Sequence, residues 1–111
     1  NRLIDEESKS LRDRKNISFN GFMDICLIIS KNGNIERSPI INLKGLPVNE
    51  HELNEIKYEI EDKIFDICKS YSLNNKKQET NIIDNLKISL KKIIQFRLSK
   101  KPFTNINIIR L

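Results

Sequence analysis

The first regular pattern of apolar positions covers residues 21–29, where apolar side chains occur on both sides of an alternating segment. Side chains in a strand point alternately to opposite faces, so odd and even positions separate into two sets. One predicted face carries Met23, Ile25, Leu27 and Ile29, and the other carries Phe22, Asp24, Cys26 and Ile28. A strand that is apolar on both faces is expected at the centre of a sheet.

A turn and a second strand are predicted next. The pair Asn32-Gly33 is the strongest short signal for a β-hairpin, in a turn where both central residues adopt positive φ. The return strand is therefore expected over residues 35–43. Pro39 lies inside that segment and cannot donate a ladder hydrogen bond, which predicts an edge strand or a bulge.

Two amphipathic helices follow. Asn49 is expected to cap the first, with Glu52 three residues later as in a capping box. Its apolar stripe comprises Leu53, Ile56, Ile60, Ile64, Ile67 and Tyr71, with Cys68 beside it. The second helix is expected to begin at Thr80 or Asn81 and to be stopped by Pro102. Its predicted stripe comprises Ile83, Leu86, Leu90, Ile93, Ile94 and Arg97.

Residues 103–111 alternate again and predict a third strand, so the element order is β-β-α-α-β. We predict an α+β, two-layer α/β fold in which a three-stranded sheet carries two antiparallel helices on one face. This is the simplest arrangement that buries both helical stripes. The domain is expected over residues 17–111, and the charged residues 1–16 are expected to be a connector.

The second face of the predicted sheet has no helix to cover it. It carries Phe22, Cys26 and Ile28 from the first strand, and Ile109 from the last. Apolar patches of this kind on small domains usually mark a partner surface, so we predict an association face at these four residues. The alternative is that residues 1–20 fold back over it.

Composition places the chain among folded domains, because 38% of its 111 residues are hydrophobic and 32% are charged. No apolar run is long enough to cross a bilayer, and the N-terminus lacks the apolar region of a signal peptide. We therefore expect no membrane contact and a cytoplasmic location. The chain opens with Asn1 in place of Met, so a piece of a larger protein is expected.

Candidate catalytic and metal-binding residues are few. His51 is the one histidine of the sequence, and no second histidine or cysteine stands at metal-ligand spacing from it. The serines are scattered without a histidine base that could activate one of them as a nucleophile. Cys26 and Cys68 lack metal-ligand spacing and are expected to be reduced core residues. No phosphate-binding glycine motif occurs. We expect no catalytic residue, no metal ligand and no cofactor in this segment.

Charge is unevenly distributed along the chain. Residues 49–75 hold seven acids and three lysines, whereas residues 76–111 hold nine basic residues and two acids. This predicts neighbouring helices with complementary flanks. The basic surplus also predicts phosphate contacts at Lys87, Lys91, Lys92, Lys100 and Lys101. The sequence has no aromatic signature or GXXG loop typical of RNA-binding modules.

One segment resembles a known family. In residues 10–22 a leucine is followed by Arg12-Asp13-Arg14, a short gap and Gly21, which opens a long apolar strand. The segment resembles the passage of ribonuclease J in which the catalytic part gives way to the C-terminal domain. The resemblance continues through residues 25–35, 39–40, 44–46, 101–102 and 106–111.

The resemblance implies a parent enzyme of the metallo-β-lactamase/β-CASP class, which uses zinc to cut RNA internally and to degrade it from the 5′ end. The family's metal motifs lie upstream of this domain, so no catalytic or zinc-binding residue is carried over. The resemblance also implies a three-stranded sheet against two helices, linked to oligomer assembly and full activity.

Three hypotheses follow. The first is a non-catalytic assembly module that contacts its own catalytic domain and a second copy of itself. We expect the resulting homo-oligomer to be a dimer, in which RNA is bound by the parent enzyme. The second is an auxiliary RNA-binding module that uses the basic second helix. The third is an unrelated small α/β protein that docks on a protein partner.

Overall fold

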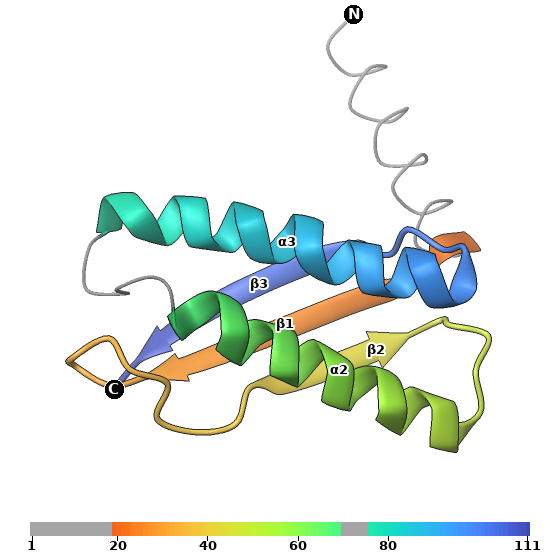
Figure 1. Ribbon diagram of the computed structural model, residues 1–111, viewed down its shortest axis with the longest axis horizontal. Coiled ribbons are helices and arrows are strands. Elements are labelled where there is room, and N and C mark those ends of the chain that lie inside the picture. Colours follow the sequence, from red (N-terminus) through yellow and green to blue (C-terminus); the bar gives the residue numbers. More distant parts are fainter. Residues whose placement is uncertain (1–18, 70–75) are drawn as a thin grey trace, which may run out of the picture.

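The computed structural model describes residues 19–69 and 76–111, which form a three-stranded sheet covered by two helices (Figure 1). The strands are β1 (Phe22–Ile29), β2 (Ile40–Lys44) and β3 (Phe103–Arg110), in the spatial order β2-β1-β3. β1 pairs antiparallel with β2 and parallel with β3. The strand that is apolar on both faces is central, as predicted, because both of its edges are paired.

The helices α2 (Glu50–Lys69) and α3 (Lys76–Leu98) lie between β2 and β3 in the chain. A parallel pair such as β1 and β3 requires a long crossover connection, and these helices provide most of it. Both cover the same face of the sheet and run antiparallel to each other (Figure 1). The predicted α+β architecture and the order β-β-α-α-β are confirmed.

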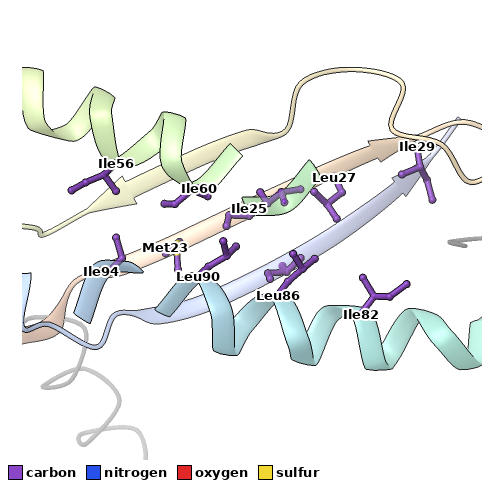
Figure 2. Close-up of a cluster of buried hydrophobic side chains, with 12 residues drawn as sticks. Met23, Ile25, Leu27, Ile29, Ile56, Ile60, Ile82, Leu86, Leu90 and Ile94 are labelled. Atoms are coloured by element: carbon purple, nitrogen blue, oxygen red, sulfur yellow. The ribbon is translucent and has the colours of Figure 1, made fainter. Parts of the chain in front are cut away.

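The core lies between this face and the helices. The odd positions of β1 and three isoleucines of α2 have no solvent-exposed surface (Figure 2). The buried set is Met23, Ile25, Leu27 and Ile29 of β1, with Ile56, Ile60 and Ile64 of α2. Burying each such side chain contributes about 1.5–3 kcal/mol relative to leaving it in water. Leu53 and Ile67 of the predicted α2 stripe are partly buried, and Tyr71 lies outside the described residues.

The stripe of α3 differs from the prediction at two positions, because Arg97 is exposed and a different isoleucine is buried at the start of the stripe. Ile82, and not Ile83, is fully buried, so the buried ladder follows four-residue steps through Ile82, Leu86, Leu90 and Ile94 (Figure 2). Ile83 and Ile93 pack at the margin of the core. Two adjacent isoleucines satisfy the helical period almost equally well. The rotation of the helix on the sheet decided between them.

The helix ends are only partly as predicted. The Glu52 backbone N–H donates to Asn49 Oδ1 over 2.8 Å, so Asn49 is the N-cap of α2 as expected. The predicted start of α3 at about residue 80 was wrong, because the helix begins at Lys76. It ends well before Pro102: Ser99 adopts a left-handed φ of 55° and its N–H donates to Gln95 O.

The turn after β1 is not the two-residue turn that Asn32-Gly33 predicted. Gly33 N–H donates to Ser30 O over 3.0 Å, and Ser30 N–H donates to Asn34 O over 2.8 Å. Gly33 has a φ of 82°, whereas Asn32 is not among the residues with positive φ. The loop therefore has three residues, 31–33, with glycine in the bulge position.

This turn sets which side chains of the return strand face the core. A two-residue turn would pair Ile29 with Glu36, but the three-residue loop pairs Ile29 with Ile35. A one-residue shift moves every following side chain to the other face of the sheet. Ile41 and Leu43 consequently pack against the core, while Ile40 points away from it.

The return strand predicted over residues 35–43 was too long. Ile35 forms an isolated bridge, and regular pairing resumes only in β2 with Cys26 opposite Ile40. Pro39 directly precedes β2 and has no N–H to donate, which explains the interruption. The prediction of an edge strand is confirmed by the strand order.

At Gly21, just before β1, the backbone lies very close to the chain at the end of β2. The φ of Gly21 is +87°, and a Cβ built there would lie 2.8 Å from Lys44 O and 2.8 Å from Leu46 Cδ2. A side chain is therefore disfavoured both by the backbone conformation and by the neighbouring chain.

We predict that Gly21→Ala destabilises the domain by about 1–3 kcal/mol, because the new Cβ adds a clash to an unfavourable φ. Urea unfolding followed by circular dichroism measures this. Gly33→Asn is the control, since Asn tolerates positive φ and should cost less. Equal unfolding midpoints for Gly21→Ala and the wild type would show that the close approach at Gly21 imposes no constraint.

Candidate functional site

The strand register defines which side chains lie on the face of the sheet opposite the helices. Residues paired across neighbouring strands point to the same face. The even positions of β1 therefore share this face, which we call the open face, with their partners in β2 and β3. Four rows cross it: Lys44–Phe22–Phe103, Asn42–Asp24–Asn105, Ile40–Cys26–Asn107 and Ile28–Ile109.

The four residues of the predicted association face all lie on the open face, but in three different rows. Phe22 is at one end of the sheet, Cys26 is near the middle, and Ile28 and Ile109 are at the other end. The alternative cover, residues 1–20, falls almost entirely on residues 1–18, which lie outside the described part of the chain.

The first row is aromatic and basic. The rings of Phe22 and Phe103 are parallel, with centroids 6.1 Å apart and an interplanar angle of 11°. Lys44 extends the row on the other side of Phe22, because it is the β2 partner of that residue. Phe103 is 40% exposed, so one ring of the pair is open to solvent.

The second row is polar. Asn105 Nδ2 donates to Asp24 Oδ1 over 3.0 Å, and Asn42 lies on the β2 side of Asp24. The hydrogen bond orients the carboxylate across the sheet. This row separates the aromatic end of the open face from the rest.

The remaining rows form an apolar surface. Ile40 and Ile109 are each 50% exposed, and Leu111 is 55% exposed. The Leu111 N–H donates to Ile29 O over 3.0 Å, so the chain after β3 keeps its register. We call Cys26, Ile28, Ile40, Ile109 and Leu111 the apolar half of the open face. Ile40 was not predicted there, because the face of the sheet to which its side chain points depends on the turn before β2.

The five lysines predicted to contact RNA do not lie along one line. Lys87 and Lys91 are one turn apart on α3, but Lys92 is rotated by about 100° from Lys91. Lys100 and Lys101 follow the helix and lie beside the start of β1. Lys100 Nζ is 3.7 Å from the centre of the Phe19 ring, and Lys101 N–H donates to Asn20 Oδ1 over 3.1 Å.

The acidic and basic segments do meet, as predicted, between the two helices. Arg97 Nε donates to Glu59 Oε2 over 2.6 Å, and Arg97 Nη1 lies 3.7 Å from Glu55 Oε2. The hydrogen bond to Glu59 raises the pKa of Arg97, because it stabilises the charged guanidinium. A second pair joins Arg110 of β3 to Glu79 of α3. These pairs join α3 to α2 and to β3, and because their side chains are partly exposed each contributes little to stability.

Residues 9–111 of the sequence match the family model of the ribonuclease J C-terminal domain. The chain belongs to this family. No curated protein matches it. The match confirms the resemblance across nearly the whole chain, including the two helices. This ribonuclease J C-terminal domain is thus an accessory domain of a ribonuclease. The assignment of residues 1–16 as a connector stays a prediction.

Within the described residues, the domain has no group of three His, Cys, Asp or Glu side chains that could hold a metal ion. The His51 side chain is 86% exposed, and its Nε2 lies 3.2 Å from Glu55 Oε1 in the first turns of α2. No described helix is long and apolar enough to cross a membrane.

The two cysteines lie on opposite sides of the sheet. Cys68 packs against the core from α2, whereas Cys26 is on the open face, so only the first matches the predicted core position. Both are free thiols. Burial raises the pKa of the Cys68 thiol above its ordinary value, because the thiolate is less well solvated there.

We predict that iodoacetamide labels Cys68 more slowly in the folded domain than in urea. The thiolate is the reactive form, and the raised pKa makes it scarcer at a given pH as long as the domain is folded. Mass spectrometry of peptides labelled at mildly alkaline pH measures both rates, with Cys26→Ser as the background. A folded rate as high as the unfolded one would contradict the burial of Cys68.

Proposed function

We propose that this domain is a non-catalytic module that joins copies of its parent ribonuclease through the apolar half of the open face. The observation that carries the proposal is the exposure of Ile40, Ile109 and Leu111 on one surface, each at least 50% exposed. Covering half of such a side chain contributes about 1 kcal/mol, so a surface of this kind favours a partner.

The chemistry of the apolar half supports a second copy as the partner. The rows that form it carry only apolar side chains, a thiol and the amide of Asn107, with no charged group among them. A twofold interface places one patch against the same patch of the other subunit, and an uncharged apolar patch is complementary to itself. The expected dimer follows from this symmetry.

The proposal leaves the chemistry to the parent enzyme. His51 is exposed and pairs with Glu55, and Arg97 of α3 pairs with Glu59 of α2. The proposal assigns no zinc ligand to this domain, because the described residues contain no group of three side chains that could hold a metal ion. In this proposal zinc, the RNA substrate and contact with the catalytic domain are taken from the family. The cytoplasmic location is proposed from the composition, because the sequence has no apolar run long enough to cross a membrane and no apolar region of the kind found in signal peptides.

We predict that Ile109→Asp weakens self-association of the 111-residue chain by about a hundredfold or more. Two carboxylates, one from each copy, would be buried in the twofold interface, and about 1.4 kcal/mol corresponds to each tenfold change. Analytical ultracentrifugation over a wide range of protein concentration measures the dissociation constant.

Ile88→Asp is the matched control. Ile88 is 58% exposed, but it lies on α3, on the other side of the sheet, so its substitution should leave association unchanged. Ile28→Asp is a second test on the central strand, with thermal unfolding used to confirm that it folds. A wild-type chain that stays monomeric at the highest concentration reached would refute the proposal.

We also predict that labelling of Cys26 slows as the protein concentration rises, because a second copy covers the apolar half. Cys68 is an internal reference on the helical side of the sheet, and its labelling rate should not depend on concentration. Peptide mass spectrometry reports both rates from one sample. Equal concentration dependence at the two thiols would place the interface elsewhere.

A further inference from the structure

Aromatic and basic side chains gather at the end of the sheet where β1 begins. Phe103 N–H donates to Gly21 O over 3.1 Å, and Lys101 N–H donates to Asn20 Oδ1, so the connector after α3 lies against the start of β1. Three of the five phenylalanines and three lysines lie at or near the starts of β1 and β3 and the end of β2: Phe19, Phe22, Phe103, Lys44, Lys100 and Lys101. Lys100 contacts the Phe19 ring, and Phe22 lies between Phe103 and Lys44 in the first row of the open face. We call this group the basic aromatic end.

The packing of the core does not account for these side chains. Phe19 is 70% exposed and Phe103 is 40% exposed, although phenylalanine is among the residues most often buried. Nor are they continuous with the apolar half of the open face. The polar row of Asp24 separates the two, and Phe22 is about 20 Å from Ile28 at the rise of a strand.

We infer that the basic aromatic end binds single-stranded RNA. Bases stack on exposed aromatic rings, and a base can extend the parallel pair of Phe22 and Phe103 on its open side. Lys44 and Lys101 are exposed. Lys44 lies beside Phe22 across the sheet and Lys101 precedes Phe103 by two residues, so both are close enough to the ring pair to neutralise phosphates of a bound strand.

The polar row gives the next nucleotide hydrogen-bonding partners. It lies one step along the strands from the aromatic row, about 6.6 Å at the rise of a strand. Asn42 and Asn105 carry amide groups, and Asp24 is a carboxylate oriented by its hydrogen bond from Asn105. Amides and carboxylates bind the donor and acceptor groups on base edges.

Charge favours RNA over a second copy at this end. A twofold contact through the basic aromatic end would bring the lysines of both copies together, and like charges across an interface are costly. A phosphate backbone instead neutralises them. This inference goes beyond the association proposed above, and it places the RNA contact away from the lysines of α3.

The test is binding of a fluorescein-labelled single-stranded oligouridine to the 111-residue chain, measured by fluorescence anisotropy over a range of salt concentrations. Phe103→Leu keeps an apolar side chain but removes the ring, and it should weaken binding by roughly five- to a hundredfold. Lys44→Glu should weaken binding severalfold and lower the slope of log affinity against log salt by about 0.7 for each lost phosphate contact.

Lys92→Glu is the matched control, because it makes the same charge change on α3, on the helical side of the sheet. We expect its affinity to stay within about twofold of the wild type. Thermal unfolding shows whether each variant folds, and Lys44→Glu tests the inference even if Phe103→Leu does not fold. Ile109→Asp should bind RNA as the wild type does, which separates this inference from the association proposal.

Three results would overturn the inference. The first is a wild-type chain that does not bind the oligomer at low salt. The second is equal loss for Lys92→Glu and Lys44→Glu with no effect of Phe103→Leu, which would indicate general attraction to lysines. The third is a Phe103→Leu variant that loses self-association but keeps its RNA affinity, which would assign the end to a protein interface.

Discussion

The rest of the structure depends on the burial of the odd positions of β1 beneath two helices. Met23, Ile25, Leu27 and Ile29 are fully covered, and α2 contributes isoleucine side chains to the same layer while α3 contributes isoleucine and leucine side chains. A three-stranded sheet has two faces, and the two described helices cover one of them. The even positions of β1 therefore remain on a surface that the core does not use. The proposed functions of the domain are placed on that surface.

The open face is divided by the register of its strands. Parallel pairing of β1 with β3 places Phe103 beside Phe22 and Ile109 beside Ile28, so similar side chains meet in rows. The polar row of Asp24 and Asn105 lies between the aromatic and apolar rows. One small sheet can thus present an apolar surface suited to a second copy and a basic aromatic surface suited to RNA. Both surfaces would be close to a parent enzyme that acts on RNA.

Much of the architecture was predictable from local patterns. The alternation over residues 21–29 predicted a central strand, Asn49 predicted the start of α2, and the element order predicted the two-layer fold. The errors have local physical reasons. Ile82 and Ile83 fit the helical period almost equally, and Asn32-Gly33 is compatible with a three-residue loop as well as with a two-residue turn. The match to the ribonuclease J C-terminal domain family agreed with the resemblance seen in the sequence.

The sequence by itself determined the order of the elements, the parity of β1 and β3 and the family, because hydrophobic periodicity and capping act between residues close together in the chain. Only the tertiary structure decided which residues become neighbours across strands. The loop at Gly33 and the interruption before β2 placed Ile40 beside Cys26, and the crossover of the helices placed Phe103 beside Phe22. Such pairings join residues far apart in sequence and depend on the packing of the whole layer. No local pattern encodes them.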